Sequence, residues 1–502
     1  MTKKTIILTI LVFILALLVR CYWFSQKQGF HTDEIFTVVI SKNNEYGFTK
    51  YFDTEKTYTG KEIKEIVFGL NDNSPKEILN SLKSLRFHNN GDTPNTPLYY
   101  SLFRISQIGL NSFDIKNIYQ RGFYLNLILF SLSFFFMFKL INLLNFDKKY
   151  IPFILAFCYL NTGTISMSIF ARYYALQEMA FVFLSYVFVY IYKTEKINTV
   201  QNFSKIISSG TITILSGYYG IIYSAILGLI LLIKKRSGWF LICSFIIAIG
   251  LTFLIYPNYL DFIYAPRVGI SDNSLLSNIT NNLNLALFAS YQILLNYLFY
   301  SIITIISILT LIFNKKLLKD NILWILIGIN LFCYILFLLF APQKVLRYTE
   351  PLFPILSLIL PAIILETKKL KTVLISLICI IITISFTLPT KFESYDSMLN
   401  PPRIAISRGN IENIFVNTTC EPIKTTNSPI IITETNGWNI LNIIPYLRDE
   451  QRIKIDYTEE PSIYKGNFIL LATEKSLILP STAKIEKEFS CQRFKGYVIE
   501  NK

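Results

Sequence analysis

Residues 5–24 read TIILTILVFILALLVRCYWF, and this stretch decides the class of the protein. A run of about twenty apolar residues is long enough to cross the hydrocarbon core of a bilayer as one helix. Lys3 and Lys4 precede it, it is longer than the apolar core of a usual signal peptide, and no small-x-small cleavage pattern follows. We therefore expect an uncleaved signal-anchor helix with a cytoplasmic N-terminus.

The apolar pattern continues along the chain. Of 502 residues, 52% are hydrophobic and only 16% are charged, and the mean hydropathy is +0.44. Soluble domains carry about 25% charged residues. The predicted fold class is therefore an α-helical polytopic membrane protein with about eleven transmembrane helices. The further apolar segments lie at 118–141, 151–169, 172–192, 205–217, 219–233, 238–256, 284–312, 321–340, 347–365 and 371–388.

The loops bear on the number of spans and on their orientation. Segments 205–217 and 219–233 meet at SGYYG (216–220), which is either a tight turn or a kink within one helix, giving eleven or ten spans. Under the positive-inside rule the basic loops favour eleven spans, with the N-terminus inside and the C-terminus outside the plasma membrane. Lys and Arg gather in every second loop, near 139–149, 193–205, 234–236, 315–319 and 368–371.

These loops also account for the net charge of +15. No nucleic-acid-binding motif is present, so we expect membrane lipid and no nucleic acid as a partner.

Two polar regions are expected outside the membrane. The first is a large loop, 25–116, within a transmembrane module that spans 1–388. The second is the tail, 389–502, in which strand-like runs and one helix-like stretch indicate a small α/β domain. The runs lie at 429–433, 466–472 and 496–499, and the helix-like stretch lies at 438–448.

Seven cysteines are too few and too scattered for a disulfide scaffold. Cys420 and Cys491 are the two that lie in the polar tail, and outside the cytoplasm they could pair or remain thiols. The others fall in apolar segments, where cysteine behaves as a small hydrophobe.

The first outer loop carries the acids best suited to catalysis. Asp33 and Glu34 lie shortly after the first span, near the interface, where charge is costly unless it is used or hydrated. Asp33 could act as a general base with Glu34 orienting it, or both could hold a divalent cation. The alternative is a pair of solvated carboxylates. Later in the loop, Asp92 is a candidate for the substrate pocket and a further candidate metal ligand, and Tyr99 is a candidate pocket residue.

Cationic and aromatic residues stand at the outer ends of two later spans. Arg172 and Tyr173 belong to the stretch ARYYAL, and a guanidinium fork matches phosphate oxygens. Lys344, Arg347 and Tyr348 stand at the outward end of the tenth span, 347–365. Lys344 and Arg347 could form a pocket for a lipid phosphate together with Arg172, and Tyr173 and Tyr348 are candidates for the substrate pocket. In both places interfacial anchoring is the alternative.

Glu178 lies about two turns deeper than Arg172. An acid inside a membrane span is a functional candidate, here for the substrate pocket, or it pairs with a neighbouring helix. His31 and His88 lack a zinc-ligand spacing, and no Walker A, G-x-G-x-x-G or G-x-S-x-G motif occurs, so ATP-driven transport and serine hydrolysis have no support.

Together these features resemble the GT-C class of membrane glycosyltransferases, in particular the bacterial relatives of dolichyl-phosphate-mannose–protein mannosyltransferases, including the lipid A aminoarabinose transferases. That class is similar in its signal-anchor helix, its early Asp or Asp-Glu, and an A-R-x-Y-A-L stretch like residues 171–176. Its H-P-P-L-Y-Y stretch looks like NTPLYY at 95–100, where Asn-Thr replaces His-Pro, and its late Arg-Tyr corresponds to Arg347-Tyr348, with Pro351 and Pro354 following.

The resemblance implies transfer of a sugar from a polyprenyl-phosphate donor to a glycan, lipid or protein acceptor at the outer face, with inversion. Asp33 would deprotonate the acceptor, and Arg172, Lys344 and Arg347 would hold the leaving phosphate. A divalent metal ion could assist. Two other readings stay open. One is an O-antigen polymerase or ligase, which usually has its large loop late in the chain, and the other is a lipid-linked oligosaccharide flippase, which would place charges in several spans.

Overall fold

The computed structural model divides the chain into two compact units. The helical unit comprises Met1–Ser25, Asp92–Tyr99 and Gly122–Arg408, and the sheet unit comprises Gln26–Gly91, Tyr100–Arg121 and Gly409–Lys502. The structure describes residues 2–25, 32–42, 52–68, 73–87, 97–110, 115–260, 321–340, 348–362, 420–433, 440–456, 466–472, 483–491 and 494–501, apart from short gaps at 196, 235–237, 360 and 442.

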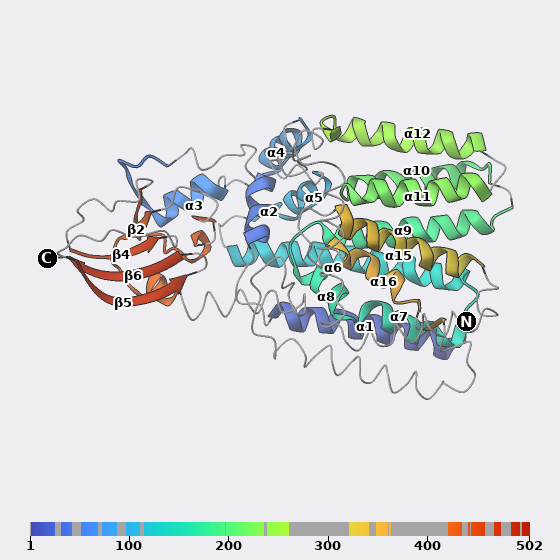
Figure 1. Cartoon of the computed structure of the whole chain (residues 1–502), viewed down its shortest axis with the longest axis horizontal. Coiled ribbons are helices and arrows are strands. Elements are labelled where there is room, and N and C mark those ends of the chain that lie inside the picture. Colours follow the sequence, from blue (N-terminus) through green and yellow to red (C-terminus); the bar gives the residue numbers. More distant parts are fainter. Residues whose placement is uncertain are drawn as a thin grey trace. The chain divides into compact units, whose positions relative to one another are not determined.

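The helical unit is a bundle of apolar helices (Figure 1). Among the described residues, four segments are long and apolar enough to cross a membrane: Lys3–Ser25, Asn117–Leu143, Tyr174–Lys193 and Gly238–Ile255. These features are those of a multi-pass membrane protein. In chain order the helices are α1 (Lys3–Ser25), α6 (Ile115–Leu143), α7 (Ile151–Tyr159), α8 (Thr162–Ile169), α9 (Tyr174–Lys193), α10 (Val200–Leu215), α11 (Tyr219–Lys234), α12 (Gly238–Ile255), α15 (Asn321–Phe340) and α16 (Phe353–Leu356), with short 3-10 turns η2 (Lys148–Tyr150) and η7 (Glu350–Leu352).

Two predicted spans differ from a single straight helix. The segment at 151–169 is broken into α7 and α8, and Lys148–Tyr159 and Gly163–Ile169 are bent by 63°, so together they count as a fifth candidate span. Asn161 caps the start of α8, because its Oδ1 accepts a hydrogen bond from the backbone N–H of Thr164 at 3.0 Å. The described part of 347–365 consists of η7 and the short α16, each with a proline in its first turn. The predicted segments at 284–312 and 371–388 lie outside the described residues.

The segments at 205–217 and 219–233 are two helices joined by a turn, as the first of the two alternatives predicts. Gly217 has φ +146°, which favours glycine. A methyl group at Gly220 would lie 1.9 Å from the carbonyl oxygen of Thr213, so α10 and α11 meet backbone to backbone. The hairpin therefore depends on the missing side chain of Gly220.

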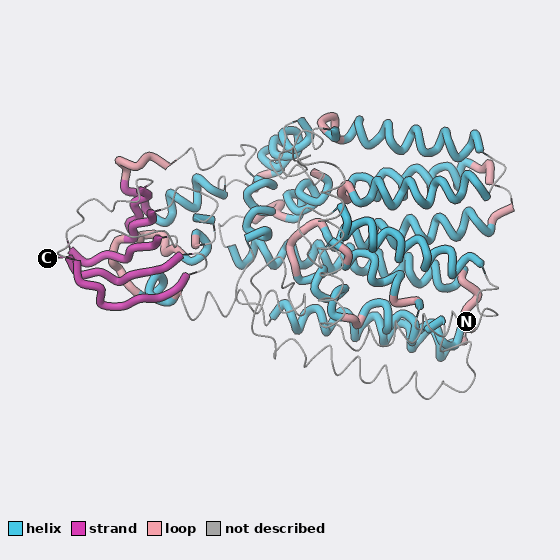
Figure 2. The backbone as a smooth tube through the Cα atoms, viewed as in Figure 1, coloured by secondary structure: helices cyan, strands magenta, loops and turns pink. Residues whose placement is uncertain are grey.

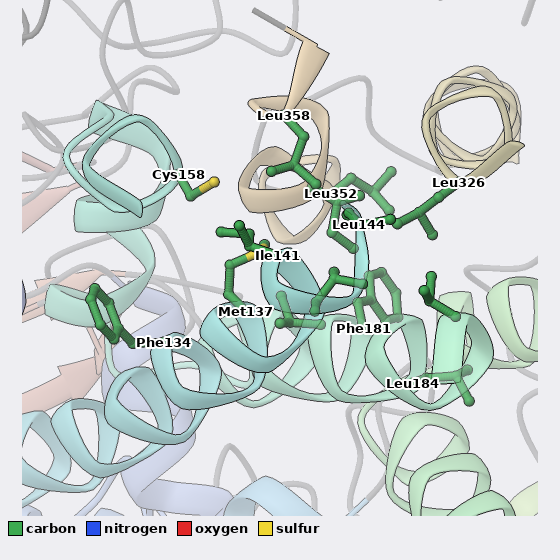
Figure 3. Packing of buried hydrophobic residues seen from close by; sticks show 14 of the residues in the cluster. Phe134, Met137, Ile141, Leu144, Cys158, Phe181, Leu184, Leu326, Leu352 and Leu358 are labelled. Carbon is green, nitrogen blue, oxygen red and sulfur yellow. The ribbon is translucent and has the colours of Figure 1, made fainter. Parts of the chain in front are cut away.

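α9 runs through the core of the helical unit. In the most apolar 18-residue stretch of each helix, 83% of α9 is buried, against 28% of α1 and 22% of α12. α1 and α12 present apolar side chains outward, as lipid-facing helices do. Figure 3 shows side chains of α6, α7, α9 and α15 packing together with Leu352 and Leu358. The labelled side chains of these four helices are Phe134, Met137, Ile141, Cys158, Phe181, Leu184 and Leu326, and Leu144 follows the end of α6.

The sheet unit contains one mixed sheet of six strands in the order β1-β3-β2-β4-β6-β5. β2 is parallel to β3 and to β4, and the remaining pairs are antiparallel. Figure 2 draws the strands in magenta. They are β1 (Thr57–Thr59), β2 (Ile430–Thr433), β3 (Arg452–Asp456), β4 (Gly466–Ala472), β5 (Ala483–Cys491) and β6 (Phe494–Asn501).

The three strands expected in the tail are confirmed as β2, β4 and part of β6. The predicted helix at 438–448 is reduced, among its described residues, to short helical turns that include the 3-10 helix η10 (Ile444–Tyr446). Cys420 and Cys491 form a disulfide, which settles the alternative left open. The edge strand β1 comes from the first loop and pairs with β3, a long-range pairing that the local pattern did not indicate.

The other elements of the sheet unit are short helices. They are α2 (Thr32–Lys42), α3 (Gly60–Phe68), α4 (Pro75–Phe87), the part of α5 (Leu98–Ser106) beyond Tyr99, and α20 (Glu421–Thr425). α3 begins with a reciprocal cap, in which the backbone N–H of Thr59 donates to Glu62 Oε2 at 2.7 Å and that of Glu62 donates to Thr59 Oγ1 at 3.2 Å.

Candidate functional site

The backbone before Arg172 is held by a buried amide. Asn126, on α6, donates its Nδ2 hydrogens to the carbonyl oxygens of Ser168 at 3.1 Å and Phe170 at 2.9 Å. The hydroxyl of Tyr99 in turn donates to Asn126 Oδ1 at 2.9 Å. The N–H of Arg172 then donates to the Phe170 carbonyl at 2.7 Å, which closes the bend between α8 and α9. Tyr99, predicted as a pocket residue, therefore also helps to position the Arg172 segment.

Arg172 is buried beside aromatic rings at the start of α9. Its side chain is only 5% exposed, and its Cζ lies 5.6 Å from the centroid of the Tyr173 ring. The Tyr173 and Tyr174 rings lie 4.3 Å apart. The N-terminal end of a helix carries partial positive charge, which adds to that of the guanidinium. This end of α9 thus combines positive potential with aromatic surface.

Tyr348 joins the same cluster from a distant part of the sequence. Its ring lies 6.3 Å from that of Tyr174 and 5.8 Å from that of Tyr219, at the start of α11. Tyr219 also packs against Phe337 of α15, at 4.4 Å. Four tyrosines, Tyr173, Tyr174, Tyr219 and Tyr348, form what we call the tyrosine cluster. Arg172 lies beside it, next to the Tyr173 ring. Lys344 and Arg347 lie outside the described residues.

Glu178 lies deeper in the bundle and is bonded to a neighbouring helix. It is 2% exposed, and the Ser133 hydroxyl of α6 donates to its Oε1 at 3.0 Å. Ser133 also shares a hydrogen bond of 2.7 Å with the Tyr159 hydroxyl. Arg20 and Glu350 interact with Glu178 electrostatically. The described contacts of Glu178 therefore match its second predicted role, pairing between helices.

Arg20, which the sequence pattern did not single out, is fully buried in the bundle. Its guanidinium donates to Ser168 Oγ at 2.8 Å and to the carbonyl oxygens of Ala16, Tyr159 and Thr164 at 3.0 to 3.3 Å. Its Cζ also lies 3.7 Å from the Phe130 ring centroid. The signal was a single charge within the apolar run of residues 5–24.

Asp33 and Glu34 lie in the first turn of α2, in the sheet unit, where the helix dipole favours negative charge. Asp33 is half-buried, whereas Glu34 is 1% exposed. Successive residues of a helix do not face each other, so the two side chains do not converge on one point. This geometry suits distinct roles better than shared ligation of a metal ion. Within the part of the chain that the structure describes, no group of three or more His, Cys, Asp or Glu residues could hold a metal ion.

The third candidate ligand, Asp92, lies outside the described residues, as do His31 and His88. The residues that are described do not by themselves fit a metal centre, and the divalent ion stays a prediction.

Two cations are buried in the described part of the sheet unit. Arg104, 2% exposed, donates to Ser81 Oγ at 3.1 Å and to Asn73 Oδ1. Burial, together with the charge of Arg104, lowers the pKa of Lys42 to about 8. A lysine charged at neutral pH in this position costs folding free energy.

No protein family, curated protein or solved structure matches this chain.

Proposed function

We propose that this chain is a membrane glycosyltransferase of the GT-C type, with about eleven transmembrane helices and its C-terminus outside the cell. It would transfer a sugar from a polyprenyl-phosphate donor to an acceptor at the outer face of the plasma membrane. The observation that carries the proposal is the meeting of Arg172 with the tyrosine cluster at one end of α9. The stretch 171–176 and Tyr348, which belong to two motifs on which the resemblance rests, thereby lie close in space.

The distribution of charge in the helical unit supports the outer location. Lysines gather at the opposite end of α9, where Lys193 donates to Asn145 Oδ1 at 3.0 Å and Lys205 Nζ lies 3.8 Å from the Tyr190 ring centroid. Under the positive-inside rule this end would be cytoplasmic. Arg172, about 30 Å away along the helix, would then face outward.

The proposed reaction is an inverting substitution at the anomeric carbon. Asp33 would accept the proton of the acceptor hydroxyl or amine, with Glu34 orienting it. The acceptor oxygen or nitrogen bonds to the anomeric carbon as the bond from that carbon to the phosphate oxygen breaks. The leaving group is a polyprenyl phosphate, whose charge Arg172, Lys344 and Arg347 would stabilise. Tyr173 and Tyr348, with Tyr99 and Glu178 behind them, would line the pocket.

The test is lipid mass spectrometry on cells that lack the protein, complemented with wild type, with Arg172→Ala or with Asp33→Asn. We expect a polyprenyl-monophosphate sugar to accumulate in the null and in both variants, and its mass identifies the sugar. Lys139→Met, which removes an exposed cation of α6, is the control and should restore the wild-type lipid profile. Accumulation of diphosphate-linked oligosaccharides instead would favour a polymerase or a flippase, and full rescue by both variants would overturn the proposed site.

A further inference from the structure

We infer that Gln177 of α9 reads a hydroxyl group of the donor sugar, and so contributes to the sugar specificity of the proposed transferase. The inference rests on the proposed function. It starts from a side chain that the sequence analysis did not single out, one turn along α9 from Tyr173, whose carbonyl oxygen accepts the Gln177 N–H at 3.0 Å.

The Gln177 amide is buried and has no hydrogen-bond partner among the described residues. The residue is 0% exposed, and across the described part of the chain neither its Oε1 nor its Nε2 has a hydrogen-bond partner. Buried amides are nearly always paired, because leaving them unpaired costs folding free energy. Other polar side chains of α9 follow that rule: Ser185 donates to the Phe181 carbonyl at 2.7 Å, and Glu178 accepts from Ser133. An amide that is buried without a partner among the described residues is a candidate for binding a ligand.

The surroundings of the amide place it beside the tyrosine cluster. A methyl group at Gly217 would lie 3.2 Å from Gln177 Nε2 and 3.8 Å from the Tyr173 ring, so the amide and the ring meet over this glycine. Gly217 lies in the turn between α10 and α11, and it has no side chain that would crowd the Gln177 amide. Through Tyr173 the amide is continuous with Arg172, the proposed phosphate-binding residue.

A sugar hydroxyl matches these groups chemically. A carboxamide offers one acceptor and one donor group, and a hydroxyl both donates and accepts, so the two can exchange two hydrogen bonds. Ligand sites commonly pair an aromatic surface with a few placed polar groups. The lipid chain of the donor has no hydrogen-bonding groups, and its phosphate is assigned to cations. The sugar is therefore the part of the donor left to satisfy Gln177.

The test compares the full-length wild type with Gln177→Leu in detergent micelles. The probes are decaprenyl phosphate and decaprenyl-phosphate-linked glucose, galactose, mannose and their N-acetylamino forms. We expect Gln177→Leu to bind the best sugar lipid about tenfold more weakly than wild type does, because one or two hydrogen bonds are lost. It should bind decaprenyl phosphate as well as wild type does. Its melting temperature should equal or exceed that of wild type, since an unpaired amide is removed. Met179→Leu, an apolar exchange on the same helix, is the control and should change neither affinity.

The outcomes separate the inference from the proposed function. Unchanged affinity of Gln177→Leu for the sugar lipid would overturn the inference, as would a wild type that binds no sugar lipid better than decaprenyl phosphate. A clear loss of stability in Gln177→Leu relative to Met179→Leu would also overturn it, because the amide would then be bonded within the fold. Failure of wild type to bind decaprenyl phosphate at all would remove the proposed function, and the inference with it.

Discussion

The guanidinium of Arg20 donates a 2.8 Å hydrogen bond to Ser168 Oγ and thereby ties α1 to α8 in the apolar interior of the bundle. Arg20 also binds three backbone carbonyl oxygens, so its charge is solvated by the protein itself. Ser168 lies shortly before Arg172, and its carbonyl oxygen is held by Asn126. The first helix thus braces the segment on which the proposed phosphate site depends.

Replacing Arg20 should destabilise the helical unit strongly. Arg20→Met removes the four hydrogen bonds and leaves buried Glu178 without its opposite charge, so we expect a loss of about 3–5 kcal/mol in the free energy of unfolding. Thermal unfolding in detergent measures it. Lys139→Met is the matched control, because Lys139 is exposed and lies over the Phe135 ring, and it should change stability by less than about 1 kcal/mol. Equal effects of the two variants would refute the bracing role.

A methyl group at Gly220 should disrupt the hairpin of α10 and α11. It would lie 1.9 Å from the Thr213 carbonyl oxygen, a distance that requires the backbones to separate. We expect Gly220→Ala to cost about 1–3 kcal/mol, measured by thermal unfolding. Gly250→Ala on α12 is the control, because a methyl group there meets nothing within 4 Å. If Gly220→Ala were as stable as Gly250→Ala, the close approach of the two helices would be wrong.

Tyr99 and Asn126 should act as positioning residues for Arg172. Tyr99→Phe removes the 2.9 Å hydrogen bond to Asn126 and should cost about 1 kcal/mol. Asn126→Leu should cost more, because the carbonyl oxygens of Ser168 and Phe170 lose their partner, and it should weaken binding of decaprenyl phosphate. Thermal unfolding measures the loss of stability, and titration of that lipid against each variant measures the affinity. Tyr124→Phe, on the exposed face of α6, is the control.

The disulfide between Cys420 and Cys491 should be essential to the sheet unit. It closes a loop with a sequence separation of 71 residues, for which the chain-entropy argument gives about 4 kcal/mol. Cys420→Ser with Cys491→Ser should therefore lower the melting temperature of the sheet unit, which differential scanning calorimetry of the full chain can follow. Cys21→Ser, at an exposed free cysteine of α1, should not change it. Mass spectrometry after alkylation checks the bond directly, since two blocked thiols in the oxidised wild type would contradict the pairing.

Lys42 should make the stability of the sheet unit depend on alkaline pH. Its pKa is lowered from 10.5 to about 8 in the folded chain, so between these values the unfolded chain binds more protons. Stability attributable to Lys42 therefore rises as pH increases from about 8 to 10.5, by up to about 3 kcal/mol. Lys42→Met should be more stable than wild type at pH 7 and should lack this rise. Denaturant unfolding of both proteins across this pH range gives the difference, and parallel curves would refute the shift.

Much of the helical architecture could be predicted from local sequence. Apolar runs of membrane-spanning length gave α1, α6, α9 and α12 within a few residues, because burial in lipid depends on the composition of each segment. The restart of α8 at Asn161 was missed, since one side-chain cap inside an apolar run leaves the average hydropathy almost unchanged. The three tail strands followed from their apolar, strand-like runs, whereas β1 is three residues long and is paired with β3 from a distant part of the chain.

For the site, the sequence alone determined which residue types stand at the ends of spans, because apolar runs, charges and motifs are properties of single segments. It singled out Arg172, Tyr173 and Tyr348, but contact between α9 and the segment after α15 came from packing. The tertiary structure alone decided that Asn126 and Arg20 support this segment, that Cys420 meets Cys491, and that the Gln177 amide is buried without a hydrogen-bond partner among the described residues. The reason is physical: burial and hydrogen bonding are relations between segments far apart in the chain, and no local pattern encodes a partner.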